Sequence, residues 1–208
     1  MQNISSLENV HKDEDIYIIA SGKSCDYIDP LFFKDRIAIG VNAVFRRFKH
    51  LNYIVYKDGT PPTDRPDIPL IMSQYSHGML AYDKTECDYY FEHNNNGCSD
   101  IDFNGLHPHG DKLVVSFSTI TSAIHLAAFM GARTIFLVGH DCASLDDQFN
   151  LGGYSARGED TEAWYGDWLS RIGTQTVLLR EYLRIEYGMP LVSISPFIGL
   201  KHEGHRIS

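Results

Sequence analysis

Small, hydroxyl-bearing and charged residues follow the first apolar run of the sequence, and their chemistry suits a phosphate group. Four such residues come directly after Ile16–Ala20: Ser21, Gly22, Lys23 and Ser24. Backbone N–H groups, two hydroxyls and an ammonium in one turn can bind a phosphate. The turn is not a P-loop, because that motif needs a glycine where Tyr17 stands. An ordinary strand-to-helix turn is the alternative interpretation.

Hydroxyl residues also crowd the segment 116–122, at the start of an apolar helical pattern. A helix uses one of them as its N-cap. The surplus, which includes Thr121 and Ser122, makes a donor-rich helix N-terminus that favours a phosphate or carboxylate. Simple capping with solvent exposure would explain the same residues.

Polar residues follow three other apolar runs. Asn42 can present a donor and an acceptor to a base or ribose, or can satisfy the backbone of a turn. Asp58 can hold a metal or a sugar hydroxyl, although Asp-Gly is also a plain turn signal. The third group permits close approach of a ligand and acid–base chemistry, and consists of Gly139, His140 and Asp141.

Two histidine pairs and one basic cluster are the remaining candidate binding sites. His107 with His109, and His202 with His205, have spacings that a metal can use, but no third ligand accompanies either pair. We therefore predict no metal site. The basic cluster 46–50 is interpreted as a solvated helix face or as a surface that recognises an acidic substrate.

The elements that position these residues alternate along the chain. Apolar runs predict strands over 16–20, 37–41, 53–56, 70–72, 113–115, 134–138 and 191–194. Helical spacing predicts helices over about 119–130 and 170–187. The fold class is therefore α/β, a Rossmann-like three-layer sandwich with a mostly parallel sheet of six or seven strands and helices on both faces. In such sheets, ligands bind beyond the carboxyl ends of the strands.

Length and composition limit the remaining possibilities. The 208 residues, 43% of them hydrophobic, exclude a disordered chain, and we expect a single Rossmann-like domain over residues 1–208. Irregular segments are expected at about 75–110 and, as a lid, at about 142–168. The formal charge of −9 argues against bulk attraction to nucleic acid or to an anionic membrane.

Cysteine usage and the polar N-terminus indicate the compartment. The four cysteines form no CxxC pair, and residues 1–15 do not resemble a secretory signal. The longest apolar stretches are far shorter than the roughly 20 residues of a membrane span. We therefore expect a reduced, cytoplasmic protein without a membrane span.

Several of these segments resemble one family. Ile16–Asp29 resembles the Gly-Pro-Ser-Leu turn that opens the Rossmann-like glycosyltransferases related to Campylobacter-type sialyltransferases. Ile39–Asn42 resembles their second-strand motif, and Val192–Pro196 their closing strand. Thr119–Asp141 resembles their block of Thr-Ser, helix, glycine, strand and Gly-x-Asp. The wider group includes flagellin-modification accessory proteins and archaeal hydroxymethylpterin diphosphokinases.

Carried over by position, the resemblance implies a nucleotide site and a catalytic group. The nucleotide contacts would be Ser21, Gly22, Ser24, Asn42, Thr121, Ser122, Gly139 and Ser195, and the chemistry of the turn itself adds Lys23 as a predicted contact. Asp141 would lie beside the donor sugar or phosphate, and Tyr154 would match a lid tyrosine that steadies the leaving phosphate. His140 is added as a catalytic candidate by its own acid–base chemistry. The lid would present Arg157, Trp164 and Tyr165 to the acceptor.

The sequence also departs from the family pattern. Lys23 stands where the group has proline, and Thr119 stands where the sialyltransferases have arginine. Their lid histidine has no counterpart between His140 and His202.

The resemblance implies a nucleotide-dependent transferase, foremost a glycosyltransferase with a CMP- or UDP-type sugar donor. The acceptor would be a glycan, a protein or a modified base. One alternative is an ATP-dependent diphosphokinase of the hydroxymethylpterin type, which would require Mg²⁺. Another is a non-catalytic nucleotide-binding or scaffold protein. No resident cofactor is implied, and a homo-oligomer is compatible with the sequence.

Overall fold

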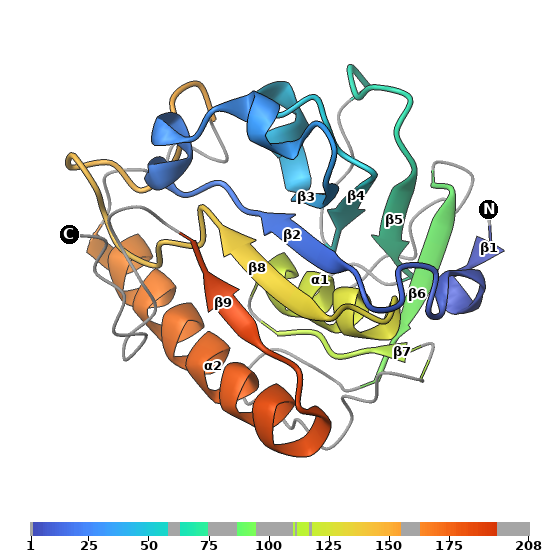
Figure 1. Cartoon of the computed structure of the whole chain (residues 1–208). Helices are drawn as coiled ribbons and strands as arrows, with labels where there is room; N and C mark the ends of the chain where they lie inside the picture. Colours follow the sequence, from blue (N-terminus) through green and yellow to red (C-terminus); the bar gives the residue numbers. More distant parts are fainter. Residues whose placement is uncertain are drawn as a thin grey trace.

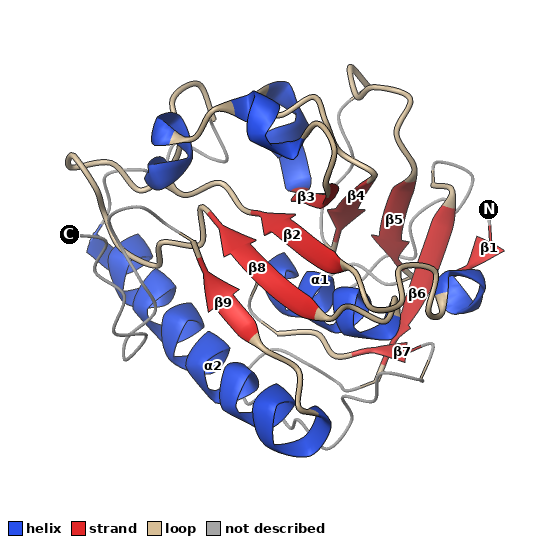
Figure 2. Cartoon of the chain, viewed as in Figure 1, coloured by secondary structure: helices blue, strands red, loops and turns tan. Residues whose placement is uncertain are grey.

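The structure is a computed structural model that describes residues 2–57, 63–74, 87–94, 110, 112–116, 118–154 and 163–194. These residues form one nine-stranded sheet with helices on both sides (Figure 1, Figure 2). The strands are β1 (Gln2–Asn3), β2 (Asp15–Ile19), β3 (Ile37–Val41), β4 (Tyr53–Tyr56), β5 (Leu70–Ser73), β6 (Tyr89–His93), β7 (Lys112–Leu113), β8 (Thr134–Val138) and β9 (Leu191–Ser193).

The strand order is β1-β6-β5-β4-β3-β2-β8-β9, and β7 pairs with the end of β6. Every pairing between described strands is parallel. From β2 the chain adds strands in one direction as far as β6, and after β8 it adds β9 in the other. The order therefore reverses between β2 and β8, which is the place where open parallel sheets bind ligands.

Two α-helices cover one face of the sheet. Helix α1 (Thr119–Phe129) is capped by Ser118, whose hydroxyl accepts the Ile120 N–H, and all 11 of its residues are buried. It packs on the apolar side chains that β2, β3, β4 and β8 present to this face. Helix α2 (Ala163–Tyr187) joins the same core through Ile172, Leu179 and Leu183 and lies beside β9 (Figure 1).

Short 3₁₀ helices cover the opposite face. They are η2 (Lys23–Tyr27), η3 (Pro30–Phe33) and η4 (Asn42–Arg46), whereas η1 (Ile4–Leu7) packs on the α1 side. In Figure 1, η2, η3 and η4 lie above the sheet and α2 lies below it. Phe33, Val44 and Phe48 fill this second core. Since both faces are covered, the predicted α/β sandwich with a parallel sheet is confirmed.

Two strands and the start of one helix differ from the sequence prediction. Strand β6 lies inside the segment 75–110 that was expected to be irregular. Its aromatic run Tyr89–Phe91 is short and stands among polar residues, and only Phe91 of the strand is buried. Strand β1 consists of two polar residues, which no sequence pattern marks as a strand. Helix α2 begins at Ala163, within the expected lid at 142–168, because packing of Tyr165 overrides the weak helix propensity of aromatic residues and glycine there.

Among the helices that the structure describes, none combines the length and the apolar character needed to cross a bilayer.

Candidate functional site

The strands at which the sheet order reverses end in two loops that touch each other. The Gly22 N–H donates to the Gly139 carbonyl oxygen at 2.7 Å. A Cβ atom on Gly22 would lie 2.4 Å from that oxygen, and one on Gly139 would lie 2.2 Å from the Cys25 sulfur. Gly139 also has a φ of +63°, which favours glycine. Both glycines are therefore required by the close approach of the two loops.

A buried carboxylate joins the same two loops. The Asp141 Oδ2 atom accepts the Ser24 N–H at 2.7 Å, and Oδ1 accepts the Ser24 hydroxyl at 2.5 Å. Both side chains are buried. Asp141 thus caps the first turn of η2 from the end of β8 and fixes the conformation of the turn that the sequence singled out.

The backbone donors of that turn are already used within the protein. The Lys23 N–H donates to the Phe149 carbonyl at 3.2 Å and the Cys25 N–H to the Gly22 carbonyl at 3.1 Å. Gly22 and Ser24 donate to the partners named above. The N–H groups of four successive residues, 22 to 25, are therefore engaged within the protein in this conformation.

The first part of the predicted lid, residues 142–154, packs on the turn. The Leu151 N–H donates to the Ser21 carbonyl at 2.8 Å, and the Ser21 hydroxyl donates to Asn150 Oδ1 at 3.1 Å. The Lys23 ammonium donates to Gln148 Oε1 at 2.5 Å and pairs with Asp26 at 2.8 Å. The bond to Asp26 raises the pKa of Lys23.

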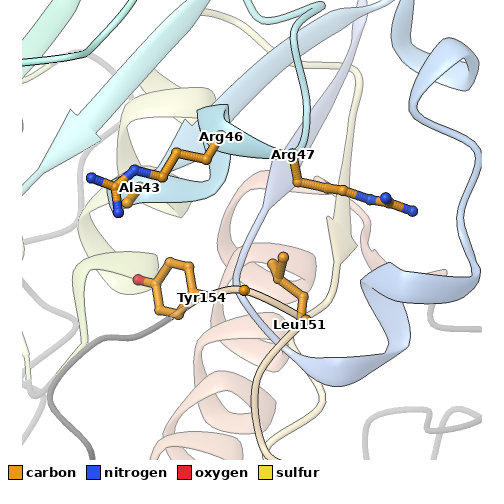
Figure 3. A pocket seen from close by; sticks show the side chains of 7 residues that line it. Ala43, Arg46, Arg47, Leu151 and Tyr154 are labelled. Atoms are coloured by element: carbon orange, nitrogen blue, oxygen red, sulfur yellow. The ribbon is translucent and has the colours of Figure 1, made fainter.

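A pocket of about 240 Å³ opens where this loop passes η4, at the carboxyl end of β3. Its lining comes from two segments: Ala43, Arg46, Arg47, Leu151, Gly152, Gly153 and Tyr154. Figure 3 shows the two arginines on one wall and Leu151 and Tyr154 on the other. Asn42 begins η4 beside this pocket in a left-handed conformation, with φ of +55°.

The pocket carries positive charge. The Arg46 side chain is 51% exposed and reaches Asp64 at 3.3 Å. The backbone N–H of Arg47 donates to the Val44 carbonyl at 3.0 Å, and its guanidinium acts electrostatically on Asp26. In Figure 3 the two guanidinium groups point in opposite directions from η4. Two residues of the basic cluster, Arg46 and Arg47, therefore line a concave surface, and their charge suits an anionic ligand.

His140 lies on the other side of β8, under helix α2. Its Nε2 atom is 2.8 Å from the Thr176 hydroxyl, which itself donates to the Ile172 carbonyl at 2.9 Å. Nε2 therefore carries the proton toward Thr176. The Cys142 sulfur lies over the same ring, 3.4 Å from Nε2 and 3.8 Å from Nδ1. Burial lowers the pKa of His140 to about 4 and raises that of Cys142 to about 12, the latter helped by Asp141.

Sequence reasoning did not find Thr176 and Cys142 as partners of His140. Thr176 is a polar residue on the apolar stripe of α2, and this was the one available signal. The geometry makes His140 a neutral imidazole that holds α2 against the end of β8.

Thr121 and Ser122 lie in a separate polar cluster. The Ser122 hydroxyl donates to the Val114 carbonyl at 3.1 Å, and Thr121 is hydrogen-bonded to Ser116 at 2.5 Å. The ammonium of buried Lys57, at the end of β4, donates to the Ser116 carbonyl at 2.5 Å. The N-terminus of α1 therefore faces β4, and these hydroxyls are engaged within the protein.

The three residues that were predicted to face the acceptor from the lid differ in their positions. Tyr165 is buried and meets Phe149 edge to face at 5.4 Å between ring centroids, so it packs the loop onto α2. Trp164 is 47% exposed. Arg157, and with it Ser195 after β9, lies outside the described residues, as does Asp58.

The sequence matches no known family model and no curated protein. The family resemblance therefore stays a prediction, and the site has to be interpreted from its own geometry.

Acidic, cysteine and histidine side chains do not gather in threes anywhere in the described part of the chain. In the segment that lines the pocket, the Leu151 N–H donates to Ser21 and the Gly152 N–H donates to both Asp26 carboxylate oxygens at 3.0 and 3.1 Å. The side chains of the lining that can bind an anion are therefore those of Arg46 and Arg47.

We expect Gly139→Ala to lower the free energy of unfolding by about 3 kcal/mol or more, because it combines a left-handed backbone with a clash against buried Cys25. Gly188→Ala is the matched control, since Gly188 has the same φ of +63° and nothing within 4 Å of the added carbon. It should cost only about 1 kcal/mol. Equal losses in urea denaturation would show that the contact between the loops carries no strain.

We expect the free energy of unfolding to fall as the pH drops from about 6.5 toward 4, by about 3 kcal/mol from His140 alone. The unfolded chain binds a proton at this histidine before the folded protein does, so acid favours unfolding. NMR titration should show a neutral His140 imidazole at pH 5. His140→Gln should flatten the dependence measured by urea denaturation, and an unchanged slope would assign it to other groups.

Proposed function

We propose that this protein is a nucleotide-binding transferase that uses a nucleotide-activated sugar. The observation that carries the proposal is the pocket between Arg46, Arg47 and the loop 151–154, at the carboxyl edge of a parallel sheet and next to its reversal point. Phosphate-bearing ligands favour this place in α/β folds. The resemblance of the β2, β3 and β8 loops to those of Rossmann-like glycosyltransferases supports the same class.

The groups around the pocket match the parts of such a donor. Guanidinium groups bind phosphoryl oxygens through short, charge-assisted hydrogen bonds. The phenol ring of Tyr154 suits stacking on a sugar or base, and Ala43 and Leu151 supply apolar contact. In transfer, Arg46 and Arg47 would stabilise the negative charge of the departing nucleotide.

The turn at β2 takes a supporting role in this proposal. Asp141 acts through Ser24, because both of its carboxylate oxygens accept hydrogen bonds from that residue. Ser21 and Lys23 hold the loop that carries Gly152 and Tyr154. The donor sugar would lie between this turn and the pocket, and the acceptor would be a glycan, a protein or a modified base.

Ligand binding is tested first by thermal shift with CMP, CDP, UDP, GDP, TDP, AMP and ATP, each with and without Mg²⁺. A nucleotide at about 100 times its dissociation constant adds roughly 2.7 kcal/mol, which is several degrees. A metal-independent shift by CMP or by one sugar-type diphosphate supports the glycosyltransferase. A shift only by ATP or AMP with Mg²⁺ supports a diphosphokinase instead.

We expect Arg47→Gln to weaken binding of the nucleotide that gives the largest shift by about 10-fold, the loss of one charge-assisted contact. Arg184→Gln is the matched control, because Arg184 pairs with Glu181 on α2 and does not line the pocket. Isothermal titration calorimetry measures both affinities. Equal affinities in the two variants would show that the nucleotide does not bind in this pocket.

One observation favours a second candidate, a nucleotide-binding protein without turnover. Asp141, the predicted catalytic carboxylate, is buried and engaged with Ser24. A wild-type protein that binds a nucleotide but consumes none of its sugar conjugates, with glycans and proteins present as acceptors, would establish this candidate.

We expect Asp141→Asn to lower turnover of the nucleotide sugar at least 10-fold while changing nucleotide affinity less than about 3-fold, because it acts on the turn and not on the pocket. An amide keeps only one acceptor, so stability should fall by about 1–3 kcal/mol. Ser24→Ala removes one of the same two bonds and should give a smaller change in the same direction. Unchanged turnover in Asp141→Asn would show that this carboxylate stabilises the fold and has no role in turnover.

A further inference from the structure

Helix α2 carries a line of exposed side chains along its outer surface. Trp164, Leu178 and Ile185 have 47%, 55% and 65% of their surface exposed. Together with exposed Arg171 they stand at intervals of seven residues, from one end of the helix to the other. These four residues are named the α2 stripe. Large apolar side chains scattered singly on a surface need no explanation, whereas a heptad repeat of this length predicts a packing partner.

The fold directs the α2 stripe away from the core. The opposite side of the helix, through Ile172, Leu179 and Leu183, is buried against the sheet. Strand β9, which lies beside α2, ends the strand order, so the helix lies at the outer side of the sheet (Figure 1). Helix α2 therefore has one face in the core and one face that is open to another molecule.

The spacing of the α2 stripe suits a second helix. In a straight α-helix, positions seven residues apart drift by about 20° around the axis with each heptad. Two helices that cross at about 20° follow this drift and stay in contact over their whole length. The occupant that fits the stripe is therefore a long helix.

The charges beside the stripe complement a second copy of α2 that runs in the opposite direction. When two antiparallel copies are aligned about the level of Thr176, Arg171 lies five residues on one side and Glu181 five residues on the other. Each arginine then faces the glutamate of the other copy. Asp167 and Arg184, nine and eight residues from that level, pair in the same way. A parallel arrangement would place each of these charges opposite itself, which is unfavourable.

The apolar residues of the stripe fit the same arrangement. Leu178 lies two residues from the level of Thr176, so the leucines of the two copies flank the axis between them. Trp164 and Ile185 stand at opposite ends of the stripe, and the indole of one copy therefore reaches the isoleucine of the other. Apolar contact and charge thus select the same antiparallel alignment.

We propose that α2 forms a homodimer interface, in which the α2 stripes of two copies pack antiparallel about a two-fold axis near Thr176. A two-fold interface brings the same patch of both copies together, so the patch has to complement itself, as this one does. The inference goes beyond the proposed function and does not depend on it, since no stripe residue lines the pocket. A helix of 25 residues is about 37 Å long, so the contact is small and we expect a dissociation constant in the micromolar range.

The mass in solution tests this inference. Sedimentation velocity of the wild type from about 1 to 200 μM should show the 23.6 kDa monomer shifting to twice this mass as the concentration rises. Leu178→Glu places two carboxylates beside the axis and should raise the dissociation constant at least about 20-fold. Leu31→Glu is the matched control, because Leu31 is 63% exposed on η3, on the other side of the sheet. It should leave the dissociation constant unchanged.

Charge reversals test the antiparallel alignment separately, without touching an apolar side chain. Arg171→Glu and Glu181→Arg should each raise the dissociation constant about 5-fold, because each places like charges opposite one another twice in the dimer. The double variant restores opposite charges and should return the dissociation constant to within about 2-fold of the wild type. Melting temperatures at the lowest concentration check that every variant is folded.

Each result decides the inference. A wild type that stays monomeric at all concentrations overturns it and leaves the stripe to a different protein. A dimer that survives Leu178→Glu places the contact elsewhere, and single reversals that the double variant does not rescue exclude the antiparallel alignment, so either result also overturns it. None of these results bears on the proposed function, which nucleotide binding tests.

Discussion

A single buried carboxylate links the two strands at which the sheet changes direction. Asp141 reaches from the end of β8 to both the N–H and the hydroxyl of Ser24, at the start of η2. A charged group is buried at low cost only when its oxygens are satisfied, and here both are. The close approach of Gly22 and Gly139 makes the contact geometrically accessible. The loop 148–154 in turn packs on the turn that this carboxylate holds.

This anchoring moves the candidate ligand site away from the glycine turn. The N–H groups of Gly22, Lys23 and Ser24 are hydrogen-bonded within the protein, so the turn works as a support for the loop above it. The loop and η4 then enclose a pocket that carries two guanidinium groups, a phenol and two glycines. In the proposed arrangement, the turn positions the loop 148–154 and the pocket binds the ligand. Rigid support of this kind is what places binding groups accurately.

The carboxyl edge of the sheet holds two polar regions on opposite faces. On the η4 side lies the pocket, with Tyr56 beneath it. On the α1 side, Lys57 donates to Ser116, and their neighbours satisfy one another. Successive residues of one strand point to opposite faces, so Tyr56 and Lys57 serve different regions although they are adjacent in sequence. The first region is concave and carries two guanidinium groups, whereas in the second the ammonium and hydroxyls are hydrogen-bonded to one another and to the backbone.

The sequence alone determined the α/β class, because runs such as Ile37–Val41 are apolar on both faces and only a covered parallel sheet buries them. It also located the loops after β2 and β8. Strand β6 was not predicted, because its short aromatic run stands among polar residues and its pairing with β1, β5 and β7 is visible only in the folded structure. The pocket was not predicted for the same reason, because Arg47 and Tyr154 are distant in the chain and meet only through the strand order. Whether a polar group faces a ligand or a neighbour depends on such long-range contacts, and those exist only in the folded structure.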